Sequence, residues 1–117
     1  MRQGDHGADI NLAVIVGEVA RDATRVDTGD GRVFTNFDVV SRAGGVRSVV
    51  PVTFEGHMEI AAGDQVAVTG FVNKRFFASG ATMVSRTDVR AGRITVIRRR
   101  DQLSRFVAGV IKSLGSR

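Results

Sequence analysis

The sequence predicts an all-β domain built as a closed barrel, followed by one amphipathic helix. Short valine-rich segments follow one another from residue 10 to residue 97, and most of them end near a glycine. Several segments alternate apolar and polar residues with the period of two that is typical of a half-buried strand. Five or six such strands with short connections favour a barrel over a sandwich. The 117 residues are enough for one domain and too few for two.

The first two strands are predicted on either side of a glycine-rich turn. Residues 10–19 are almost wholly apolar, as expected of a strand buried on both faces, and Gly17 is expected to mark a bulge or bend. The sequence Thr-Gly-Asp-Gly at 28–31 favours a hairpin turn, because Asp-Gly tolerates positive φ angles. Residues 32–41 then alternate, with Phe37 on the face that we expect to be buried.

The third strand is predicted at 46–55, with Val52 and Phe54 facing inward. Pro51, the only proline, cannot donate a backbone hydrogen bond and so indicates an edge or bulged position. Residues 56–64 have room for at most one turn of helix.

The fourth strand is the longest, at 65–77, and a turn at 79–81 leads into a returning strand at 82–91. Gly92 is expected to separate this strand from a last one at 94–97. The chain therefore divides into a polar N-terminal segment (1–9), a barrel domain (10–97), and a basic lead-in with a C-terminal helix (98–117).

The C-terminal segment changes to a helical period. Its apolar residues recur at spacings of three and four and define one stripe: Leu103, Phe106, Val107, Val110, Ile111 and Leu114. Asp101 is expected to cap the start of this helix and Gly115 to end it. The stripe can pack on its own barrel, or it can contact a second subunit or another protein.

Charge is distributed very unevenly along the chain. The net charge is +5, yet residues 1–64 hold six basic and ten acidic side chains, whereas residues 65–117 hold eleven basic and two acidic ones. Fifteen of the 17 cations are arginines, whose guanidinium offers a planar fork for phosphate and a flat face for stacking. The C-terminal half is therefore expected to present a basic surface, for which anionic polymers are the usual partners.

Residues suited to catalysis are scarce. Cysteine is absent, which excludes a disulfide framework and zinc–thiolate sites, and neither His6 nor His57 has a second histidine at metal-ligand spacing. Glycine-rich nucleotide motifs and a nucleophile elbow are also absent. No apolar run approaches the ~18 residues that span a bilayer, and residues 1–7 do not resemble a secretory signal. We expect a non-enzymatic protein with no cofactor, metal, membrane or small-molecule partner.

Aromatic and polar residues alternate on the face of the fourth strand that is predicted to point outward. Rings that stack on bases beside cations that hold phosphates are what single-strand binding requires. The candidate nucleic-acid-binding residues are Phe34, Arg42, Arg47, Phe71, Asn73, Lys74, Arg75, Phe77 and Arg86. Such an outward phenylalanine can also lie under a loop or at a subunit contact. Phe76 is expected to be buried or at the barrel rim, and Arg98–Arg100 to be either a phosphate clamp or simply solvated.

Several stretches together resemble bacterial single-stranded DNA-binding proteins, in particular the short, divergent relatives of actinomycetes. The resemblance covers about residues 10–97, and the order and spacing of its pieces are more specific than any one of them. The pieces are NLAVIVGEVARD at 11–22, TNF at 35–37, VTFEG at 52–56, GDQVAVTGFV at 63–72, and RFF at 75–77 with TDV at 87–89.

This resemblance implies a five-stranded Greek-key barrel of the oligonucleotide/oligosaccharide-binding (OB) type with an extended hairpin between its fourth and fifth strands. It also implies a homodimer or homotetramer that coats single-stranded DNA in replication, repair and recombination, in the bacterial cytoplasm and associated with the nucleoid. Phe77 falls where the family has a base-stacking tryptophan, and Arg75 where it has a phosphate-contacting cation.

The sequence departs from the family in ways that imply weaker binding and a smaller footprint. Val49 and Glu55 replace family aromatics, and the acidic tail that recruits partner proteins is missing. Two alternatives therefore remain. One is an OB module that docks a replication or repair protein through the C-terminal helix, as primosomal relatives do, with weak DNA binding. The other is an OB protein that binds RNA, because such barrels accept both polymers.

Overall fold

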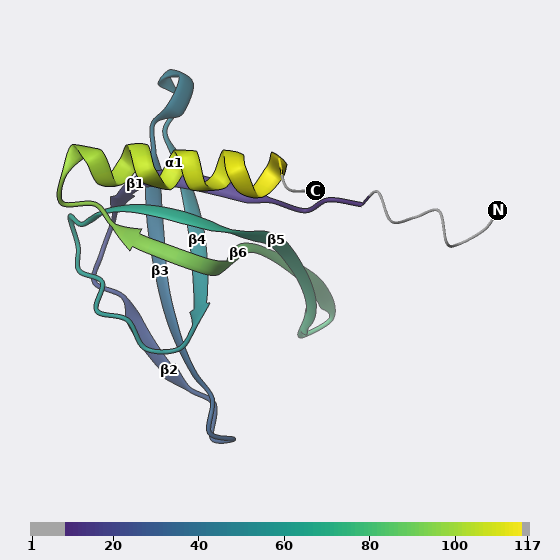
Figure 1. The fold of residues 1–117 in the computed structure, drawn as a ribbon. Coiled ribbons are helices and arrows are strands. Elements are labelled where there is room, and N and C mark those ends of the chain that lie inside the picture. Colours follow the sequence, from purple (N-terminus) through teal and green to yellow (C-terminus); the bar gives the residue numbers. More distant parts are fainter. Residues whose placement is uncertain (1–8, 116–117) are drawn as a thin grey trace.

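In the part of the chain that the structure describes, six strands form a single sheet, and one helix follows them (Figure 1). The computed structural model describes residues 9–115, so most of the predicted N-terminal segment at 1–9 lies outside the described residues. The elements are β1 (Ala13–Val19), β2 (Thr24–Asp27), β3 (Val33–Ser41), the short 3-10 turn Ala43–Gly45, β4 (Ser48–Glu55), β5 (Gln65–Ser79), β6 (Thr82–Val96) and α1 (Arg100–Gly115). A mostly β chain with a C-terminal helix was predicted, and this is confirmed.

The strand pairings close on themselves. The order along the sheet is β1-β5-β6-β4-β3-β2, and β1 pairs in addition with β3 through Glu18 and Val19. Five strands therefore form a cycle of pairings, and β2 extends β3 outside it. All described pairings are antiparallel except β4 with β6, which run parallel over Val52–Phe54. Pro51 has a partner on β3 and none on β6, so β4 is unpaired on one side at this residue, although β4 is not an edge strand of the sheet.

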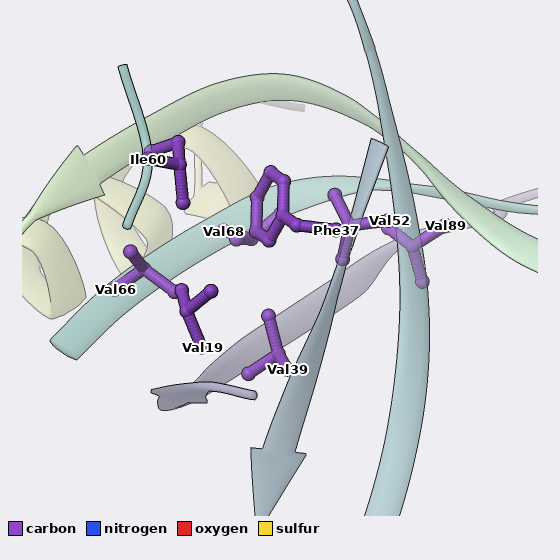
Figure 2. Close-up of a cluster of buried hydrophobic side chains, with 8 residues drawn as sticks. All are labelled: Val19, Phe37, Val39, Val52, Ile60, Val66, Val68 and Val89. Carbon is purple, nitrogen blue, oxygen red and sulfur yellow. The ribbon is translucent and has the colours of Figure 1, made fainter. Parts of the chain in front are cut away.

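Valines from five strands fill the interior (Figure 2), since branched side chains pack well on a pleated surface. The buried cluster consists of Val19, Phe37, Val39, Val52, Ile60, Val66, Val68 and Val89. The predicted inward faces of β3 and β4 are confirmed at Phe37 and Val52, whereas Phe54 is only half-buried. At Gly17 the chain approaches β3 so closely that an added Cβ would lie 2.2 Å from the Val40 carbonyl oxygen. Only glycine fits there.

The structure differs from the predicted strands at several points. Residues 82–96 form one continuous strand instead of two, because the register passes from Thr69 opposite Arg93 to Gly70 opposite Ala91 and leaves Gly92 as an extra residue. A bulge of this kind bends a strand without ending its ladder. The strand at 24–27 was not predicted, because it is fully exposed and has no buried face to give a pattern.

β5 and β6 extend beyond the sheet as a two-stranded arm, which curls away on the right of Figure 1. We use "the arm" for residues 73–88. The parallel pairing of β6 with β4 begins at Val89, so the strands of the arm pair only with each other. Both faces of the arm are consequently open to solvent over most of its length.

Helix α1 packs against β5 through part of its apolar stripe (Figure 1). Phe106 is buried, whereas Val107, Ile111 and Leu114 are exposed. The stripe is therefore divided between intramolecular packing and free surface. Within residues 9–115 no helix combines the length and apolar character needed to cross a bilayer.

The predicted cap of α1 is wrong. The helix begins at Arg100, and the Gln102 side-chain oxygen accepts hydrogen bonds from the backbone N–H groups of Arg98 and Arg99 at 2.6 and 2.8 Å. A glutamine that reaches back in this way satisfies N–H groups that a helix start leaves unpaired. Asp101 instead lies in the first turn and forms ion pairs with Arg99 and Arg105.

Candidate nucleic-acid interface

One face of the β5–β6 hairpin brings together five of the nine predicted residues. The cross-strand register places Phe71 opposite Arg90, Asn73 opposite Asp88, Arg75 opposite Arg86, and Phe77 opposite Val84. Residues directly opposite in an antiparallel pair share a face of the sheet. We call this surface the cationic face and define it by Phe71, Asn73, Arg75, Phe77, Val84, Arg86, Asp88 and Arg90.

Both aromatic rings of the cationic face are open to solvent. Phe71 is 48% exposed and Phe77 is 42% exposed. The alternative that these rings lie under a loop does not hold within the described residues. Each ring is therefore available to stack on a planar ligand, and Arg75 lies between them along β5.

Arg75 and Arg86 form a like-charged pair in the centre of the cationic face. They lie directly opposite each other, an arrangement that destabilises an antiparallel pair of strands. Among residues 9–115 neither guanidinium forms an ion pair with an acidic side chain. An anion bound between the two would remove the repulsion.

A buried carboxylate fixes the root of the arm. Asp88 accepts hydrogen bonds from the Thr53 hydroxyl at 2.7 Å and from the Asn73 amide at 3.3 Å. Arg90 Nε lies 3.3 Å from Asp88 Oδ2 as an ion pair, but the alignment is not that of a hydrogen bond. These contacts join β4, β5 and β6. Asn73, which was predicted to bind nucleic acid, takes part in these contacts through its amide.

Lys74 lies on the opposite face of the arm, together with Phe76. The Lys74 ammonium lies 5.5 Å from the centroid of the Phe76 ring, within the range of a cation–π contact. Phe76 is 65% exposed, so the expectation that it would be buried or at a rim is wrong. The arm projects past the sheet, and no other strand within residues 9–115 covers this face.

The remaining three predicted residues lie elsewhere. Phe34 is near the start of β3, opposite Glu55, whereas Arg42 and Arg47 flank the 3-10 turn at the far end of the β3–β4 hairpin. Eight residues of extended chain separate Phe34 from Arg42, which corresponds to roughly 26 Å. None of these three residues lies on the β5–β6 hairpin.

Charges at the start of β3 cancel one another. Arg32 donates two hydrogen bonds to Glu55, and this contact raises the pKa of Arg32. The hydroxyl of Thr28 donates to Asp30, which lowers the pKa of that carboxyl. The guanidinium of Arg32 also lies 5.0 Å from the centroid of the Phe34 ring. The cation beside Phe34 is thus already paired, in contrast to Arg75 and Arg86.

Histidine and acidic residues do not gather into a metal site in the part of the chain that the structure describes. His57 lies 3.1 Å from the carboxylate of Glu59, and both side chains are exposed. No protein-family model matches the chain, and no curated protein matches it either.

Proposed function

We propose that this protein binds single-stranded DNA, without enzymatic activity and with little sequence preference, through the cationic face of the β5–β6 hairpin. The observation that carries the proposal is the unpaired Arg75–Arg86 couple between two exposed rings, Phe71 and Phe77. Guanidinium groups hold phosphates, and rings stack on unpaired bases of any identity. Duplex DNA hides its bases in the stack and so cannot use the rings in this way.

The strand arrangement supports assigning the cycle of pairings to the OB fold. Within the cycle, β1, β3 and β4 follow one another along the chain and pair in that order. The next strand, β5, returns to pair with β1, which gives the spatial order β5-β1-β3-β4 of a Greek key. The OB fold is a five-stranded Greek-key barrel. Its ligand surface includes the connection between the fourth and fifth strands of the barrel, which here is the tip of the arm.

Salt dependence tests the proposal most directly. Titration of a fluorescent oligothymidine, followed by anisotropy, should give log K that falls linearly with log salt by about 0.7 per neutralised phosphate. Duplex DNA of equal length should bind more weakly, because its bases are not available for stacking. Affinity that does not change with salt would contradict the proposal, and tighter binding of a matched RNA oligomer would favour the RNA alternative.

A second candidate function is protein docking through α1, because Val107, Ile111 and Leu114 leave apolar surface exposed. A second copy of the chain and a replication or repair protein are the two occupants that we propose for it.

Substitution on the helix tests the self-association. Ile111→Arg places a charge within the exposed apolar surface, and we expect sedimentation equilibrium to show a smaller assembly than the dimer or tetramer of the unchanged protein. Val26→Arg adds the same charge at an exposed valine of β2, outside α1, and should leave the mass unchanged. Equal masses for all three proteins would exclude the helix as the self-association surface.

A further inference from the structure

The arm carries a second exposed surface directly behind the cationic face. Lys74 lies opposite Thr87, Phe76 opposite Ser85, and Ala78 opposite Met83, and we call these six residues the rear face. Phe76 and Met83 are both 65% exposed. The rear face thus contains a free ring with a cation beside it, and it has no acidic residue.

The two faces are back to back because successive side chains of a strand point to opposite sides. Phe76 and Phe77 are neighbours in the chain and therefore project from the two sides of the arm. Each ring has its own cation on the same face, Lys74 for Phe76 and Arg75 for Phe77. The arm thus offers the same pair of chemical groups, a ring and a cation, on both sides.

The tip of the arm gives a bound strand a way from one face to the other. Residues 79–82 are Ser, Gly, Ala and Thr, so the turn holds no acidic and no bulky side chain. Gly80 takes a φ of +64°, which glycine adopts at little cost and which makes this tight turn possible. A phosphodiester chain that leaves the cationic face at Phe77 meets neither a like charge nor a steric barrier at the tip.

We propose that single-stranded DNA bound to the cationic face continues around the tip and stacks a further base on Phe76, with Lys74 holding the adjacent phosphate. This inference rests on the proposed function. It adds that the length of the oligonucleotide decides whether the rear face is occupied. An oligonucleotide too short to pass the tip contacts the cationic face alone, and a longer one contacts both faces.

Single tryptophans can report on each face separately, because the chain contains no tryptophan and no tyrosine. Oligothymidines of about four and about fifteen nucleotides span the range of site sizes for one OB fold. Stacking on a base should quench the indole fluorescence of Phe77→Trp with either oligonucleotide. The fluorescence of Phe76→Trp should be quenched only by the longer one.

Affinities of alanine variants complete the test. Phe76→Ala should weaken the binding of the longer oligonucleotide by at least about fivefold, which is the lower limit for one stacked base. It should leave the affinity for the shorter oligonucleotide unchanged. Phe77→Ala should weaken both. Ile10→Ala, at a residue 69% exposed and outside the arm, is the matched control and should change neither.

The outcomes separate the inference from the proposed function. If the longer oligonucleotide quenches Phe77→Trp and leaves Phe76→Trp unchanged, the rear face is not a binding surface and the proposed function stands. If the short oligonucleotide quenches Phe76→Trp as strongly as the long one, the passage around the tip is refuted. If neither tryptophan responds to either oligonucleotide, the proposed function fails together with the inference.

Discussion

Replacing Arg75 and Arg86 together with glutamine is expected to weaken the binding of single-stranded DNA by roughly 20-fold at about 0.1 M salt. Each phosphate contact to a single strand contributes about 0.7 to the slope of log K against log salt. Loss of two contacts should therefore lower the slope by about 1.4. Anisotropy titrations at several salt concentrations measure the affinity and the slope in one series.

The same double variant should be at least as stable as the unchanged protein. Arg75 and Arg86 lie directly opposite each other without an acidic partner among the described residues, so glutamine at both positions removes a repulsion. Weaker binding without loss of stability separates a binding role from a folding defect. Arg25→Gln, at a cation paired with Asp27 on β2, is the control and should leave the slope unchanged. A double variant with the original slope would exclude this pair from the binding site.

Asp88→Ala is expected to lower the free energy of unfolding by about 2–4 kcal/mol, which urea denaturation can measure. The substitution leaves the Thr53 hydroxyl and the Asn73 amide without their acceptor, and Arg90 without its counter-charge. The expected loss is below the full cost of breaking a buried ion pair, because the Arg90 side chain is 30% exposed and water screens it.

Asp88→Asn is the matched control for this network. Asparagine keeps an oxygen that can accept the Thr53 hydrogen bond but lacks the charge that faces Arg90, so its loss of stability should be smaller than that of the alanine variant. Because Asp88 joins the arm to β4, the alanine variant should also bind DNA less tightly. An alanine variant as stable as the unchanged protein would show that the carboxylate does not hold the arm.

The prediction that residues 10–19 are buried on both faces is wrong, because Ile10, Leu12 and Val14 are exposed. Alternation in the sequence was sufficient, in contrast, to predict the buried side of β3, of β4 and of the part of β5 that lies within the sheet. Phe37 and Val52 lie inside, and Phe71 and Phe77 lie outside, because a period of two assigns a face without knowledge of the partner strand. The cross-strand partner of each residue on the arm could also be predicted from the sequence. Centring the hairpin between Gly80 and Ala81 places Arg90 opposite Phe71, and this residue was missed as a member of the cationic face.

Positions across the sheet could not be predicted in the same way. Phe34 and Arg42 both suit a nucleic-acid site in composition, but the distance between them follows from the course of β3 and not from residue type. The exposed rear face was missed for a related reason. A phenylalanine on the inward side of a strand is buried only where other strands cover that side. Beside β5, the pairing with β1 ends at Gly70, so only β6 accompanies β5 as far as Phe76.

Gly92 has a consequence for where the charges of the arm point. On β6, the odd-numbered residues Val89 and Ala91 pack on the core before Gly92 in the chain, and the even-numbered Ile94 and Val96 do so after it. The additional residue thus reverses the side of the sheet that each residue of β6 before Gly92 faces. Without the additional residue, Arg86 would lie on the same side as Lys74 and face away from Arg75. The side of the arm on which Arg86 lies is therefore set by a residue that has no side chain.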